Sequence, residues 1–157
     1  MTAQTEHPVT SILKQAIQAE EDSYTLYSTA AQAVRMPHIR GLLQELAQEE
    51  VGHKQHLESM LAGDPAQIVE AGHESQIIDL QIGDFLVAHP LGPDADCQEV
   101  LIVASKREAA SHNLYAALAK MACGVEERKL FEYLAEEELG HKNRVESIYE
   151  QIIYKEF

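Results

Sequence analysis

The sequence predicts an all-α protein, a four-helix bundle made of two related helical hairpins. The chain nearly repeats itself when it is shifted by 88 positions, so that LAQEEVGHK, which begins at Leu46, overlies LAEEELGHK, which begins at Leu134. Apolar residues recur at helical three-and-four spacing, aromatic residues make up only 6% of the chain, and tryptophan is absent. Self-similarity at a fixed offset indicates duplicated structural units.

Four helices are expected from the apolar spacing, the capping residues and the helix breakers. They cover residues 10–34, 38–62, 97–122 and 126–154. Thr10 is the expected N-cap of the first helix, and Pro37 is the expected entry into the second. Asp96, followed three residues later by Glu99, gives a capping-box pattern at the start of the third.

The connections predict how these helices are arranged. Short turns near Met36 and Gly124 make each pair an antiparallel hairpin. Residues 63–95, between the pairs, are rich in Gly, Pro and Asp and contain no long periodic segment. A connector of this length suits a compact domain if it crosses the whole bundle, as it does when the second and third helices run parallel. We therefore expect residues 1–157 to form a single ferritin-like domain with one long crossover.

The composition excludes several classes of function. The formal charge of −14 argues against binding to nucleic acid or to anionic membranes, because both need a basic surface. The sequence has no apolar stretch long enough to span a bilayer and no signal-peptide core, so a cytoplasmic protein is expected. Cys97 and Cys123 fall near opposite ends of one predicted helix and are too far apart to form a disulfide.

The stripes of the helices that should face the interior carry carboxylates and imidazoles. Two Glu-x-x-His motifs lie 88 positions apart, and each follows a further glutamate at a distance of 30 positions. All six residues fall on inward stripes at matching heights above the hairpin turns, so they should meet in one layer. The candidate metal ligands are Glu20, Glu50, His53, Glu108, Glu138 and His141.

A solvated helix face is the alternative explanation for these glutamates, and it fails on energetic grounds. The stripes would bury four unpaired carboxylates, at a cost of several kcal/mol each. Two divalent cations would cancel the four negative charges. Oxygen-rich ligation with one imidazole per metal suits iron or manganese, and zinc competes on raw affinity.

Other polar residues near the stripes leave alternatives open. Tyr24, Tyr27 and Tyr115 lie on the stripes, either as hydrogen-bond donors to ligand carboxylates or as core tyrosines. His112, one turn beyond Glu108, is a further ligand, a proton relay or a hydrogen-bonded core histidine, and we favour the last.

Some other glutamates and histidines are expected to have no metal role. Glu70 and His73 also fit the Glu-x-x-His pattern, but they lie in the crossover without a repeated partner. Glu49, Glu137 and His56 lie off the stripes and are expected at the surface.

The ligand segments resemble the rubrerythrin group of ferritin-like di-iron proteins over nearly the whole chain. Four segments carry the resemblance in order: AIQAEEDSYTLY from residue 16, LAQEEVGHK from 46, ASKREAASHNLY from 104 and LAEEELGHK from 134. The resemblance implies two iron ions per chain. It makes Glu20 and Glu108 terminal ligands, Glu50 and Glu138 bridging carboxylates, and His53 and His141 the single imidazole on each iron.

Three departures from this resemblance affect the expected function. Typical rubrerythrins have a second glutamate where this chain has Ser111. They also carry a four-cysteine rubredoxin module, which this chain lacks, so electrons would come from a separate protein such as a rubredoxin-like donor or from ferrous iron. Bacterioferritins place a haem-binding methionine where this chain has Val51, so no haem is implied.

The resemblance implies an oxidoreductase that reduces hydrogen peroxide or dioxygen at a carboxylate-bridged di-iron site, in the defence against oxidative stress. The alternatives are a ferroxidase or iron-handling protein and a non-catalytic metal-binding protein. Cage-forming relatives carry a fifth helix after the bundle, whereas this chain ends at Phe157 directly after the fourth predicted helix. We therefore expect a homodimer rather than a cage.

Overall fold

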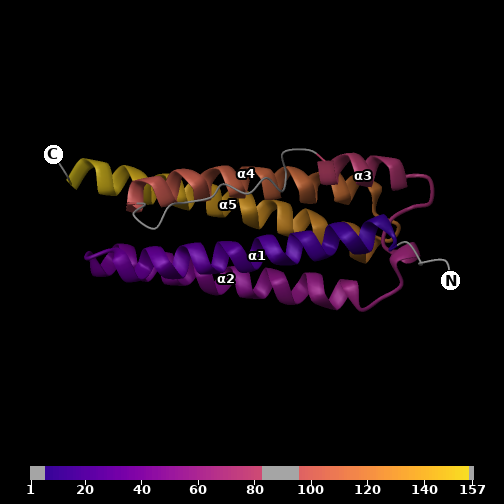
Figure 1. The fold of residues 1–157 in the computed structure, drawn as a ribbon, viewed down its shortest axis with the longest axis horizontal. Coiled ribbons are helices and arrows are strands. Elements are labelled where there is room, and N and C mark those ends of the chain that lie inside the picture. Colours follow the sequence, from indigo (N-terminus) through magenta and orange to yellow (C-terminus); the bar gives the residue numbers. More distant parts are fainter. Residues whose placement is uncertain (1–5, 83–95, 156–157) are drawn as a thin grey trace.

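The computed structural model describes residues 6–82 and 96–155. These residues form α1 (Pro8–Ala33), α2 (Pro37–Leu61), η1 (Pro65–Gln67), α3 (Glu74–Ile82), α4 (Cys97–Met121) and α5 (Val125–Lys155). The four long helices pair as α1 with α2 and α4 with α5, and the two hairpins pack side by side (Figure 1). The predicted all-α, ferritin-like four-helix bundle is confirmed. None of the described helices is long and apolar enough to cross a membrane.

The first helix begins at Pro8, earlier than the expected cap at Thr10. The ring of His7 accepts a hydrogen bond from the backbone N–H of Val9 at 3.1 Å, so His7 is the N-cap. Pro8 suits the first turn because its fixed φ is already helical and it has no N–H to leave unpaired. The prediction was wrong here because it favoured the hydroxyl of Thr10 over a histidine ring.

The start of α4 follows the expected capping pattern. A carboxylate oxygen of Asp96 accepts a hydrogen bond from the backbone N–H of Glu99 at 2.8 Å. Cys97 lies at the start of α4 and Cys123 just beyond its end, and the two are not joined in a disulfide.

The crossover contains more regular structure than the sequence suggested. After η1, the nine-residue helix α3 packs against α1 and buries Ile77 completely. The backbone N–H of Glu70 donates to the carbonyl of Met121, and that of Cys123 donates to the carbonyl of Ile68. These two bonds attach the start of the crossover to the α4–α5 turn. A nine-residue helix offers too few turns for its apolar period to be recognised.

The path of the chain agrees with the ferritin-like connectivity. Helices α2 and α4 run in the same direction, and α4 begins at the opposite end of the bundle from α3 (Figure 1). The remainder of the predicted crossover, residues 83–95, lies outside the described residues.

The apolar core consists of two clusters separated by a polar layer. On α2, Leu46 belongs to one cluster and Leu57 to the other. On α5, Val145 and Leu134 are divided in the same way. All four side chains are fully buried. The polar residues between them are therefore closed off from solvent on both sides along the bundle axis.

Candidate metal centre

All six predicted ligand residues meet in the layer between the two apolar clusters. Each is at most 2% exposed. The layer takes Glu20 from α1, Glu50 and His53 from α2, Glu108 from α4, and Glu138 and His141 from α5.

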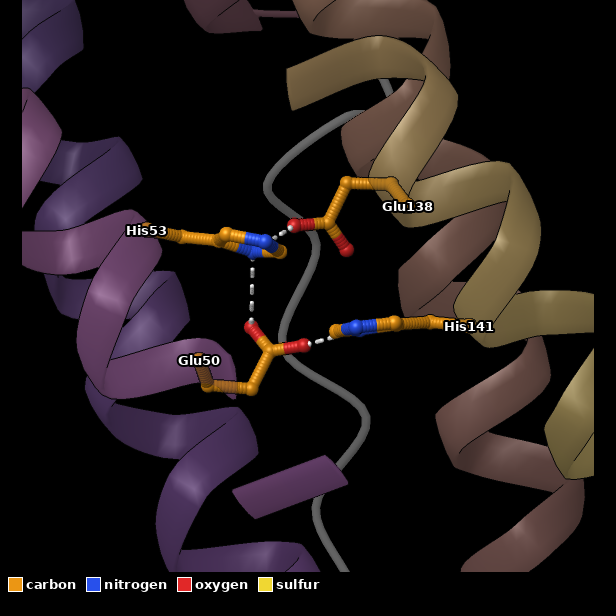
Figure 2. Close-up of side chains that lie close together, drawn as sticks. All are labelled: Glu50, His53, Glu138 and His141. Carbon is orange, nitrogen blue, oxygen red and sulfur yellow. Dashed lines mark hydrogen bonds and ion pairs between the residues drawn. The ribbon is translucent and has the colours of Figure 1, made fainter. Parts of the chain in front are cut away.

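The centre of this layer is formed by the two Glu-x-x-His motifs, which face each other across the bundle (Figure 2). Each of the four residues offers one donor atom within 4.8 Å of the others. The Nδ1 of His53 lies 3.0 Å from an oxygen of Glu138, and the Nδ1 of His141 lies 2.6 Å from Oε1 of Glu50. The other oxygen of Glu50 lies 3.9 Å from the Nδ1 of His53. The two oxygens of Glu50 therefore face two different imidazoles, as a bridging carboxylate requires.

A further glutamate lies beside each imidazole. An oxygen of Glu20 is 3.6 Å from the Nδ1 of His53, and an oxygen of Glu108 is 3.5 Å from the Nδ1 of His141. The layer therefore contains two equivalent half-sites. We call the Glu20 and His53 pair the first position and the Glu108 and His141 pair the second position.

Two buried tyrosines hold these outer glutamates. The hydroxyl of Tyr115 donates to Glu20 at 2.6 Å, and that of Tyr27 donates to Glu108 at 2.6 Å. Burial and the neighbouring carboxylate charges raise the pKa of both phenols well above the usual value, so they stay protonated donors. Of the two roles that the sequence left open, the structure shows hydrogen bonding to carboxylates.

Unlike the six predicted ligands, Tyr24 and His112 are not fully buried. Tyr24 is 43% exposed, and the buried position on that turn of α1 is Ser23, so the expected inward stripe was wrong there. The four-residue step from Glu20 turns the helix by about 400°, so Tyr24 lies about 40° past Glu20 around the helix axis. The Nδ1 of His112 donates to the backbone carbonyl of Ala135 at 2.8 Å, which ties α4 to α5. This contact agrees with a hydrogen-bonded histidine rather than a ligand.

Glu49 and Glu137 are closer to the site than expected. An oxygen of Glu49 lies 3.6 Å from the Nε2 of His141, and an oxygen of Glu137 lies 3.6 Å from the Nε2 of His53. Both glutamates are about one third exposed rather than fully solvated. The angular position of a Cα on the helix misses this contact because a long side chain reaches around the helix flank.

Two other expectations concern residues at the surface. His56 is exposed, as expected. The Nε2 of His73 lies 3.7 Å from an oxygen of Glu70, and both side chains are partly exposed and remote from the buried layer.

The carboxylates of the layer divide into two classes by pKa. Burial, together with the charges of Glu108 and Glu20, raises the pKa of Glu50 well above the usual value. Burial and the same charges raise the pKa of Glu138 in the same way. Burial also acts to raise the pKa of Glu20, but the polar groups of Glu50 and His53 beside it outweigh burial and lower the pKa to about 2. The carboxyls of Glu50 and Glu138 therefore favour the protonated form more than an exposed carboxyl does, whereas those of Glu20 and Glu108, whose pKa values are lowered, favour the ionised form.

The buried atoms of the layer fit a pair of divalent cations. One oxygen of Glu20 and one of Glu108 are buried without a hydrogen-bond partner. Such oxygens are costly to bury unless something replaces water, and a cation does so. The charges of four ionised carboxylates cancel those of two divalent ions. Four carboxylates and two imidazoles form a donor set that suits iron or manganese.

Comparison with known proteins finds a family model that matches part of this chain. A family model described as Rubrerythrin matches residues 11–79, which span nearly all of α1, the whole of α2 and part of α3. Residues 11–79 therefore resemble the rubrerythrin family. The resemblance predicted from the sequence is thereby confirmed. The rubrerythrin match and the buried Glu/His group together support a di-iron protein.

A solved structure shares the fold over most of this chain. It is a hypothetical protein from Pyrococcus furiosus, with a TM-score of 0.70, 21% sequence identity, and coverage of 93% of this chain and 90% of that chain. At this identity the similarity shows the fold alone. No curated protein matches this chain significantly.

Proposed function

We propose that this protein is a rubrerythrin-like di-iron oxidoreductase that reduces hydrogen peroxide, or dioxygen, at the buried layer. The observation that carries the proposal is the placement of Glu50, whose two oxygens face the imidazoles of His53 and His141. A carboxylate placed in this way can hold two ions close together. Two adjacent metals are suited to holding and polarising an O–O bond.

The chain's own residues fix the geometry and exclude water. Bound ferrous ions would supply the two electrons that, with two protons, convert hydrogen peroxide into two water molecules. Tyr115 and Tyr27 hold the outer glutamates by short hydrogen bonds, so those carboxylates do not need to reorganise during turnover. The apolar clusters on both sides keep bulk water out of the layer.

The proposed activity needs a source of electrons. These 157 residues contain two cysteines, whereas a rubredoxin-type iron site needs four, so we propose that a rubredoxin-like donor outside these residues re-reduces the site. The expected homodimer remains a proposal, which light scattering can test. The cytoplasmic location stays a prediction.

Anaerobic stopped-flow mixing tests the proposed function. The iron-loaded, reduced protein is mixed with hydrogen peroxide or with dioxygen, and the near-ultraviolet absorption of the oxidised iron is followed. We expect faster oxidation by peroxide than by dioxygen. Faster oxidation by dioxygen, with iron then leaving as mineral, would support a ferroxidase instead. If neither oxidant reacts, the protein is a non-catalytic metal binder.

A further inference from the structure

The contacts among the six predicted ligands follow the internal repeat. The repeat also relates the contacts that the two histidines make with residues behind them. The Nε2 atoms of His53 and His141 are both buried without a hydrogen-bond partner within normal range. Each points toward a glutamate at 3.6 Å, Glu137 for His53 and Glu49 for His141. Positions 49 and 137 are related by the 88-residue shift, so these two contacts are equivalent.

The equivalence ends at the partners of these glutamates. Arg144 lies 2.5 Å from the same oxygen of Glu49 that faces His141. The guanidinium also reaches Glu45, at 3.4 Å. The charge of Glu49 is therefore largely compensated by a cation before it reaches the imidazole.

Glu137 has a neutral partner instead. The hydroxyl of Tyr133 donates at 3.0 Å to the same oxygen of Glu137 that faces His53. The repeat equivalent of Arg144 is His56, which packs edge-on against the ring of Tyr133 with centroids 5.9 Å apart. Among the described residues no lysine or arginine pairs with Glu137, so no such cation compensates the carboxylate behind His53.

This difference affects how strongly each imidazole can bind a metal. A carboxylate behind the far N–H of a ligand histidine fixes the ring and raises its basicity as a ligand. A carboxylate paired with arginine provides less of this effect, because the guanidinium competes for the same oxygen and cancels its charge. A phenol donor leaves the charge in place.

We propose that Arg144 and Tyr133 make the two metal positions unequal, so that the first position binds a divalent cation more tightly than the second. The inference rests on the proposed two-metal site. Glu137 and Glu49 are positioning residues in this account, since they act through the imidazoles and do not touch the ions.

Titration of the metal-free protein with Co²⁺ tests the inequality, because visible absorption and calorimetry both follow binding without any turnover. Glu137→Gln should weaken the tighter binding step by about 10- to 100-fold, the usual effect of losing an outer partner of a ligand histidine. Glu49→Gln should weaken binding much less, because arginine already compensates its charge.

Variants of Arg144 provide the decisive comparison. Arg144→Gln should strengthen the weaker step, and in that background Glu49→Gln should become as costly as Glu137→Gln. Glu45→Gln is the matched control, since it removes the outer contact of Arg144 without touching the oxygen that faces His141, and both steps should be unchanged. Urea unfolding of each metal-free variant separates effects on folding from effects on binding.

The outcomes distinguish this inference from the proposed function. Equal losses for Glu49→Gln and Glu137→Gln, or an Arg144→Gln variant with an unchanged weaker step, would overturn the inequality while leaving the two-metal site intact. A wild-type chain that binds no pair of Co²⁺ ions would overturn both.

Discussion

Replacing Tyr115 by phenylalanine separates the two roles that the sequence left open for this side chain. The substitution keeps the ring and removes the hydroxyl that donates to Glu20 at 2.6 Å. Both side chains are at most 2% exposed, so water cannot easily replace the lost donor. Glu20 is ionised at neutral pH, because its pKa is lowered to about 2. The lost bond is therefore a buried hydrogen bond to a charged group.

Hydrogen bonds to charged groups contribute about 1.5–3 kcal/mol to stability. For a chain of this length, each kcal/mol shifts Tm by about 2–4 °C, so Tyr115→Phe should lower the Tm of the metal-free protein by about 3–12 °C. Urea unfolding at neutral pH measures the free energy directly. Tyr27→Phe, the equivalent substitution in the other half-site, should lose a similar amount, because its hydroxyl makes the matching bond to Glu108.

The control is Tyr24→Phe, which makes the same change at an exposed tyrosine of α1. Tyr24 is 43% exposed, so this substitution should change stability by less than about 0.5 kcal/mol. If Tyr115→Phe lowered stability by no more than this control, Tyr115 would be a packing residue. The claim that its hydroxyl stabilises Glu20 by a hydrogen bond would then be refuted.

Four further substitutions test the buried layer, one of them as a control. Glu50→Ala should lose both metal ions together, as measured by metal analysis, whereas Glu70→Ala should lose none; the reverse pattern would show that the site is misassigned. Glu138 has a raised pKa in the folded state, so its stabilising contribution is present below the usual carboxyl pKa and is lost as pH rises through the folded value. Metal-free Glu138→Gln should therefore lose less stability than wild type as pH rises, and equal pH profiles in denaturant titrations would contradict the assigned protonation. His112→Gln should keep full metal content, because the ring of His112 binds the backbone of Ala135 rather than a metal. The same variant should alter the oxidation kinetics. Loss of one metal ion per chain would make His112 a ligand.

The ligand layer could be predicted because its information is local and duplicated. Glu50 and His53 are three residues apart on one helix face, and the 88-residue shift gives the same pair at Glu138 and His141. A chance match such as Glu70 with His73 lacks this repetition. Hairpin geometry then brings the two pairs to the same height.

The features that the sequence did not predict depend on side-chain reach or on tertiary partners. Glu49 reaches an imidazole on the opposite hairpin although its Cα lies off the inward stripe. Its pairing with Arg144 joins α2 to α5 and cannot be predicted from the residue spacing of either helix. At the N-terminus of α1, the cap is a histidine ring, a residue type that capping preferences do not favour.

The most direct test of the central claim is anomalous diffraction from crystals of the metal-loaded protein, with data collected on both sides of the iron absorption edge. The account predicts two metal peaks per chain, about 3.5–4 Å apart, lying between the carboxylates of Glu50 and Glu138. A single peak, an empty layer, or peaks beside Glu70 and His73 at the surface would contradict it.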